Sequence, residues 1–348
     1  MVRMRRYALT ALALLSAACG DSIAQEGANM KTYDWLPSES APKEAPIYFV
    51  RGDLVLAGGG TTYVPDTRIV SNGWGQIGST HVVGEDKKPL PTNVSLTWLS
   101  LLENRFYAGQ FALPLDRLTV LFDRGTPLPA PRQRAAYGRV VFGMAPGGNV
   151  SVWATAGEVV TEVATFKASP TEVPFSQVTD NPEVTRESFI RENLEFAIKD
   201  DAARSAAAQP ERLAAWGDYP RRLAWTAQLA GGSPQGAVLW FSGVNGERDW
   251  FDLADPQRGG EPLPPNLPVP ASLRLNWRSA QGMLSADIAL DPVESVAAFK
   301  KLAAADRPGA MTLMVEPSPT GDTVDVFLRR GELAYRFKNT KVQVFGAD

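Results

Sequence analysis

Hydrophobic and polar residues alternate along several short stretches of the chain, and this spacing predicts β-strands. The clearest example runs from Val94 to Trp98, and the stretch from Leu273 to Trp277 has the same pattern and ends in the same residue type. In each place the next apolar stretch, at 106–113 or 283–290, has the pattern of a partner strand. We therefore expect a mainly β protein built from antiparallel pairs.

The same landmarks recur in the same order in both halves of the chain. The first half opens near Trp35 and the second near Trp225. Each then contains an apolar strand that ends at a glycine, a Pro-Leu-Pro-x-Asn motif at 89–93 or 262–266, and a later aromatic residue followed by Gly-Glu. An ordered set of landmarks of this kind predicts a duplicated domain.

The period changes to that of a helix after the paired strands. Asp291 and Pro292 form a helix start, with an acid to cap the first turn and proline at the first helical position. The first half has a corresponding apolar stripe between Pro114 and Gly125. Between the halves, 185–198 is also helical, and we expect it to brace the domains if Phe189, Ile190 and Phe196 are buried.

These patterns predict an α+β, mainly β protein of two repeated domains. Each domain is expected to be an antiparallel sheet with one long helix packed on a face, and a helical linker joins them. We expect a lipoprotein signal peptide at 1–18 and a flexible tether at 19–33. The first domain is expected at 34–184, the linker at 185–217 and the second domain at 218–348.

The N-terminus has the pattern of an export signal. Three arginines precede a short apolar run, and small residues then lead to Cys19, which is the only cysteine. A thiol at the cleavage point accepts the diacylglycerol thioether of a bacterial lipoprotein, so Cys19 is the predicted lipidation site. Gly20 follows where aspartate would retain the protein in the inner membrane, which favours the outer membrane with the protein facing the periplasm. The alternative is cleavage after Ala24 and a soluble periplasmic protein.

Charge and histidine content exclude several functions. Removing the three N-terminal arginines changes the net charge from −3 to −3 − 3 = −6, and an acidic, unclustered surface argues against nucleic acid as a partner. A Ser-His-Asp triad would have to use the lone His81, with Ser79, Glu85 or Asp86 nearby, but the chain has no Gly-x-Ser-x-Gly elbow. We expect no enzyme, no metal, and no cofactor beyond the covalent lipid.

Three stretches together resemble the bacterial lipoprotein family called domain of unknown function 2931. They run from Gly73 to Asp86, from Leu113 to Leu115 and from Val141 to Gly148, and the resemblance covers about residues 35–200. Members look like small exported lipoproteins. Some lie beside type VI secretion effectors of the phospholipase kind, which implies an immunity role. The family defines no catalytic residues that could be carried over.

The expected function is therefore recognition of a protein by a membrane-anchored lipoprotein, with a secreted lipase effector as the hypothetical partner. A binding or assembly lipoprotein of the envelope is the alternative, and a hydrolase is the more distant one. Large aromatic and charged residues in loops are the candidate contacts. These candidates are Trp74, Glu85, Asp86, Lys87, Glu103 and Arg105. Core packing competes for Trp74, because tryptophan recurs at Trp250, and solvated turns compete for the charged runs.

Overall fold

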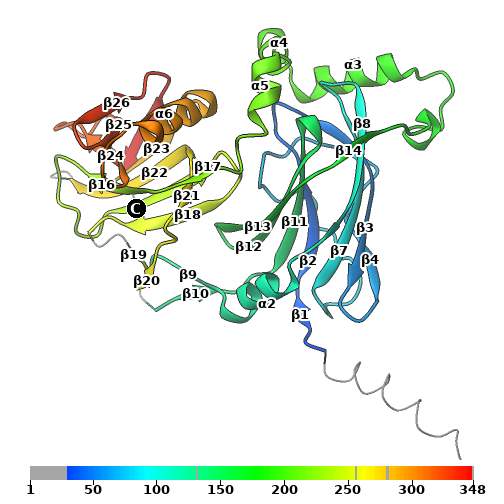
Figure 1. Cartoon of the computed structure of the whole chain (residues 1–348), viewed down its shortest axis with the longest axis horizontal. Coiled ribbons are helices and arrows are strands. Elements are labelled where there is room, and N and C mark those ends of the chain that lie inside the picture. The colour runs from blue at the N-terminus through cyan, green and yellow to red at the C-terminus, as the bar shows by residue number, and fades with distance from the viewer. Residues whose placement is uncertain (1–29, 131, 255–256, 280–281, 347–348) are drawn as a thin grey trace, which may run out of the picture.

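The computed structural model describes residues 30–346 except 131, 255–256 and 280–281. The predicted signal peptide, Cys19 and most of the predicted tether lie outside the described residues. The mainly β class is confirmed, with several antiparallel sheets and few helices. Figure 1 shows two strand-rich halves side by side, with helices α3, α4 and α5 along one end.

The first half is a sandwich of two sheets. The order in one sheet is β2 (Leu36–Ser40), β11 (Arg139–Ala145), β12 (Asn149–Ala156) and β13 (Val159–Lys167). The order in the other is β14 (Ser169–Thr171), β8 (Arg105–Ala112), β7 (Pro91–Ser100), β3 (Ile47–Leu56) and β4 (Thr61–Tyr63), with β5 (Arg68–Val70) also beside β3. Alternate residues face inward, so Trp98 from one sheet and Phe142 from the other are fully buried in one core. Helix α2 (Leu115–Arg124) adds Leu118 and Phe122 to this core.

The second half pairs its strands in the same order. One sheet is β16 (Trp225–Leu229), β24 (Met311–Pro317), β25 (Val324–Arg330) and β26 (Leu333–Arg336). The other is β18 (Arg248–Asp252), β17 (Val238–Gly243), β22 (Pro270–Ser279), β23 (Gly282–Ala289) and β27 (Lys341–Gly346). Helix α6 (Pro292–Ala304) places Phe299 in the second core, and Asp291 caps it by accepting from the Glu294 N–H at 2.9 Å.

Each half departs from the expected single antiparallel sheet in two ways. It contains two facing sheets, and the first strand of one sheet pairs in parallel with a strand that comes after the helix: β2 with β11, and β16 with β24. Period-two alternation shows which side of a strand is buried but not the direction of its neighbour, so these parallel pairs were not predictable from the pattern. The shared strand order agrees with the predicted duplication, which stays a prediction.

One sheet of each half joins the other to make a nine-stranded sheet, in the order β2-β11-β12-β13-β18-β17-β22-β23-β27. The joint is narrow, because β13 and β18 pair only at Val160 and Arg248. A hairpin of the first half, β9 (Thr126–Pro127) with β10 (Arg134–Ala135), reinforces it. There the Trp250 indole donates to the Pro127 carbonyl at 3.2 Å, and Arg134 pairs with Glu261 at 2.5 Å.

The described residues also form three further two-residue pairings. These are β1 (Tyr33–Asp34) with β6 (Lys87–Lys88), β15 (Arg222–Leu223) with β21 (Leu267–Pro268), and β19 (Gln257–Arg258) with β20 (Glu261–Pro262). Two single-turn 3₁₀ helices, η1 (Pro146–Gly148) and η2 (Phe175–Gln177), lie in loops of the first half.

The segment between the halves is helical, as predicted for 185–198. It forms α3 (Arg186–Ala197), α4 (Asp201–Ala207) and α5 (Pro210–Ala215). Ile190 of α3 is buried and Phe189 packs against Tyr48, so α3 covers part of the outer face of the β3-β7-β8 sheet. Phe196 is 78% exposed and lies on the solvent side of the helix, so the condition set for a brace between the domains is met only in part. The helix therefore braces the first half.

Candidate functional site

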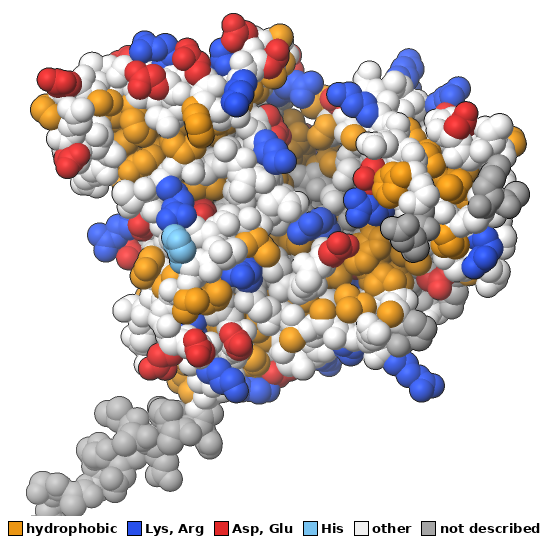
Figure 2. Space-filling view, turned by 180° about the vertical axis from the view of Figure 1, so that it is seen from behind, with side chains coloured by type: hydrophobic (Ala, Val, Ile, Leu, Met, Phe, Trp, Pro, Cys, Tyr) orange, Lys and Arg blue, Asp and Glu red, His pale blue; other side chains and the backbone are white. Residues whose placement is uncertain are grey.

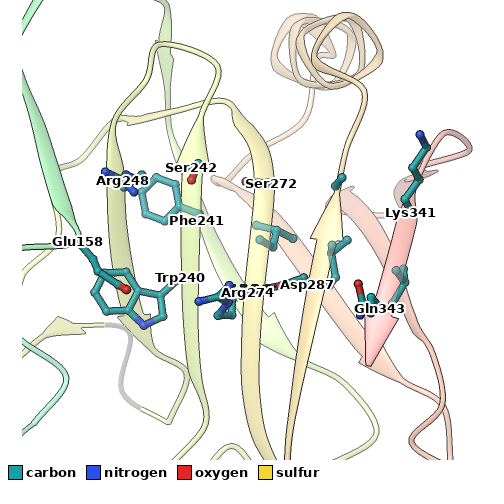
Figure 3. A pocket seen from close by; sticks show the side chains of 14 residues that line it. Glu158, Trp240, Phe241, Ser242, Arg248, Ser272, Arg274, Asp287, Lys341 and Gln343 are labelled. Carbon is teal, nitrogen blue, oxygen red and sulfur yellow. Dashed lines mark hydrogen bonds and ion pairs between the residues drawn. The ribbon is translucent and has the colours of Figure 1, made fainter. Parts of the chain in front are cut away.

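A groove of about 590 Å³ lies on the outer face of the second half's part of the nine-stranded sheet. Glu158, in the turn between β12 and β13, bounds it on the side of the first half, and Lys341 and Gln343 of β27 bound it on the other (Figure 3). Strand alternation explains the lining. Leu239 and Phe241 point into the second core, so Trp240 between them faces the groove.

Charges in the groove are only partly compensated. At its centre, Arg274 of β22 donates to Asp287 of β23 through two nitrogens, at 2.6 and 3.3 Å. Arg248 of β18 is half-buried, and its Nε has no hydrogen-bond partner among the described residues. Burial lowers the pKa of Arg248 from its ordinary value, while the carboxylate of Glu158 opposes that shift. Because the Arg248 Nε is itself buried, a carboxylate or carbonyl of a partner would form a charge-assisted hydrogen bond with the other nitrogens of this half-buried guanidinium.

The corresponding face of the first half differs in chemistry. There the outward residues near the β7–β8 turn are apolar, including Leu99 and Phe106, and the chain's own helix α3 covers them. On the second half this face carries the charged residues Arg274 and Asp287 as well as aromatic ones such as Trp240 and Phe345, and Arg274 is exposed. Two sheets of equal strand order thus present one face that the chain itself partly covers and one that is open in the described structure.

The joint beside the groove contains a buried pair of carboxyl groups. Glu162 of β13 is 5% exposed and Glu247, just before β18, is 7% exposed. The Asn245 amide donates to both, at 3.2 Å to Glu162 and 3.0 Å to Glu247. Arg222 binds Glu247 and lies 3.8 Å from Glu162. Burial, and then the charge of Glu247, raise the pKa of Glu162 to about 8. This polar cluster links the two halves across the sheet.

Trp74, a predicted partner contact, lies at the same joint. Its ring packs edge-on against Trp153, with centroids 4.7 Å apart, and against Trp216 at 5.2 Å. Gly75 beside it has φ +72°, and a β-carbon there would lie 2.3 Å from the Gly246 carbonyl oxygen. Trp74 is therefore a half-buried residue that holds the halves together, which is the packing interpretation considered for it.

The other predicted contacts are scattered. Glu85, Asp86 and Lys87 are exposed in and beside β6, at a different part of the first half from Glu103 and Arg105. The Glu103 carboxylate accepts the Gly147 N–H at 3.0 Å and the Tyr107 hydroxyl at 2.9 Å, so it stabilises a turn. Arg105 is exposed at the start of β8. The structure does not place these charged residues, Glu85, Asp86, Lys87, Glu103 and Arg105, in one site with Trp74.

The triad considered around His81 is not formed in the described residues. The Ser79 hydroxyl donates to the buried Glu39 carboxylate at 2.8 Å and accepts from Arg68, so its partners are a carboxylate and a guanidinium. The His81 side chain is exposed and makes no hydrogen bond to Ser79. No group of three or more metal-ligating side chains occurs in the part of the chain that the structure describes.

Sequence reasoning missed the residues that line the groove. Trp240 lies within the apolar run 237–241, which the sequence predicts only as an apolar strand that ends at a glycine, although strict alternation places every second residue on the opposite face. Arg274 appeared as the polar position of an alternating strand. The local pattern shows that these side chains point outward, but only the pairing of β18, β17, β22, β23 and β27 places them on one surface.

The comparisons with known proteins agree with the resemblance drawn from the motifs. The model of the family described as protein of unknown function (DUF2931) matches residues 22–205. The chain belongs to this DUF2931 family. The match covers the first half and α3, so all the residues that line the groove except Glu158 lie outside the DUF2931 region. Neither the curated proteins nor the solved structures give a match.

Two further observations concern the described helices and the charges on the surface. None of the helices in the described residues is long and apolar enough to span a bilayer. On the back of the molecule, basic and acidic side chains are interspersed (Figure 2). This mixture offers contacts of both signs to a protein surface.

Proposed function

We propose that this chain is a periplasm-facing lipoprotein, anchored through lipid on Cys19, which binds a type VI secretion effector of the phospholipase kind and neutralises it. The observation that carries the proposal is the open groove of the second half, where a tryptophan lies beside an incompletely bonded arginine. Tryptophan and arginine are the residue types that contribute most to protein–protein binding when a partner desolvates them. A membrane anchor would hold this binding face beside the lipids that such an effector attacks.

The groove indicates what the partner surface presents. An apolar side chain would pack on Trp240, and an acidic or carbonyl group would bond to Arg248. Arg274 and Asp287 already neutralise each other, so their contribution is shape and orientation. We expect inhibition by occlusion of the effector's active site, because binding in the groove requires no covalent bond to form or break.

The test is titration of the full-length protein with a phospholipase of the type VI effector kind, starting with any that is encoded beside its gene, by calorimetry and by a phospholipid-hydrolysis assay. Trp240→Ala is expected to weaken binding by about 30-fold or more, the effect of losing an interface anchor of about 2 kcal/mol. Tyr63→Ala is the matched control, because Tyr63 is a 51% exposed aromatic residue on β4 of the first half.

Two results would count against the proposal. If the protein neither binds nor inhibits a co-encoded phospholipase, the immunity function is wrong. If it inhibits but Trp240→Ala and Tyr63→Ala behave alike, the function stands and the groove is not the contact surface.

A further inference from the structure

The nine-stranded sheet ends at β27, and this edge has no neighbouring strand among the described residues. Figure 3 shows β27 as the outermost strand, on the side of the groove away from the first half. A strand at a sheet edge directs every second pair of backbone N–H and C=O groups toward solvent, where another strand can pair with them. Proteins commonly block such edges with short strands, proline or charge.

The first half blocks its corresponding edge with a short strand and a proline, whereas the second half has only Lys341, at the first position of its edge strand. The equivalent strand of the first half is β14, which has three residues and contains Pro170, a residue without an N–H to donate. Strand β27 has six residues, Lys341–Gly346, and no proline. Its outer-face residues are Lys341, Gln343 and Phe345, and Phe345 is 41% exposed. Val342 and Val344 lie on the opposite face, partly buried against the second core.

We propose that β27 pairs with β27 of a second copy of this chain, antiparallel and centred on Gln343. In an antiparallel pair of identical strands related by a two-fold axis, residues opposite each other lie on the same face of the sheet. Because side chains alternate between the faces, the numbers of two opposed residues are both odd or both even, and their sum is even. Centring on Gln343 places Gln343 opposite itself, Val342 opposite the second copy's Val344, and Lys341 opposite the second copy's Phe345.

The chemistry of β27 favours this self-pairing. The valines meet on the face that already contacts the core, the two glutamine amides can bond to each other, and the Lys341 methylenes cover the exposed Phe345 ring. The two Lys341 side chains are four residues out of register, about 14 Å apart, so like charges do not meet. The sheet would continue through both copies and present the two grooves on one face.

A pair of six-residue strands is a small interface, so we expect self-association to be weak in dilute solution. Anchoring both copies in one membrane, as proposed above, would raise their effective concentration. The test therefore uses the full chain in its membrane. The cysteine variants are Gln343→Cys, Lys341→Cys and Phe345→Cys. Cross-linked dimer is measured on non-reducing gels after mild oxidation. The wild-type protein shows how much dimer forms through Cys19 alone.

The expected result depends on the register. Opposed residues have Cβ atoms about 5 Å apart, which small adjustments bring within disulfide range, whereas the copies of residue 341 or 345 are too far apart. Gln343→Cys should give at least fivefold more dimer than the other two variants. Equal cross-linking at all three positions, which indicates random collision, or no cross-linking at 343, would overturn the proposal.

A second measurement avoids oxidation. Gln343→Arg places two guanidinium groups opposite each other only in the paired state, and should weaken self-association at least tenfold in sedimentation equilibrium of the detergent-solubilised full chain. Lys341→Arg keeps the charge pattern and should leave self-association unchanged. Unaltered self-association of Gln343→Arg contradicts the pairing. Either result is independent of lipase binding, so this proposal and the proposed function can fail separately.

Discussion

The buried carboxyl group of Glu162 makes the joint between the halves sensitive to pH. Burial and the neighbouring Glu247 raise its pKa to about 8, against an ordinary value of 4.5, although the Arg222 guanidinium, the Asn245 amide and the Ser151 hydroxyl oppose the shift. The folded protein therefore keeps a proton on Glu162 at pH 7 that the unfolded chain has lost. A carboxyl group whose pKa is raised in the folded protein lowers the unfolding free energy at every pH at which the unfolded chain has lost that proton.

The magnitude follows from linkage between proton binding and folding. Below about pH 4.5 both states are protonated and there is no cost. Between about pH 4.5 and 8 the unfolding free energy should fall by about 1.4 kcal/mol for each pH unit, and above pH 8 the full cost is present. From pH 5 to pH 7 this amounts to roughly 2–3 kcal/mol for the wild-type protein.

Glu162→Gln removes the titration and keeps the size and hydrogen-bonding oxygen of the protonated side chain. The unfolding free energy of the variant minus that of the wild type should therefore rise by roughly 2–3 kcal/mol between pH 5 and pH 7. Urea denaturation at each pH, followed by tryptophan fluorescence, measures this difference, and other titrating groups largely cancel in it. Trp153 reports on the joint directly, because its indole donates to the Asn245 carbonyl at 3.1 Å.

The matched control is Glu158→Gln, which neutralises an exposed carboxylate in the turn before β13. Its stability difference from the wild type should stay nearly constant over the same pH range. The reasoning is refuted if the stability difference between Glu162→Gln and the wild type is also constant between pH 5 and pH 7. That result would show that Glu162 is ionised in the folded protein at pH 7.

Three further predictions concern stability and the anchor. Asp291→Ala removes the side-chain cap of α6 and should lower the unfolding free energy by about 1 kcal/mol, measured by urea denaturation, whereas Asp291→Asn should retain most of it. Trp250→Phe removes the buried hydrogen bond to the Pro127 carbonyl and should destabilise the protein by about 1–3 kcal/mol in the same assay; a loss below 0.5 kcal/mol would show that this bond does not hold the hairpin. Cys19→Ser should release the protein from the membrane fraction, and intact mass spectrometry of the wild type should find lipid on Cys19; an unmodified chain that begins at Gln25 would contradict the anchor.

The sequence alone determined the features that depend on near neighbours in the chain. The start of α6 follows from Asp291 and Pro292, whose capping and fixed φ act within one turn. The inward side of β7 and β22 follows from alternation, and Trp98 and Trp277 are indeed buried. The family followed from short motifs, which the family match over residues 22–205 supports.

The tertiary structure alone decided what depends on distant pairing. Glu162 and Glu247 are 85 residues apart in the chain, and no local pattern brings them together; their contact arises because β13 and β18 meet at one residue pair. The groove likewise needs five strands and the Glu158 turn in one arrangement. Backbone preferences and alternation act over a few residues, whereas the choice of which strands pair, and in which direction, is made by burial summed over the whole chain.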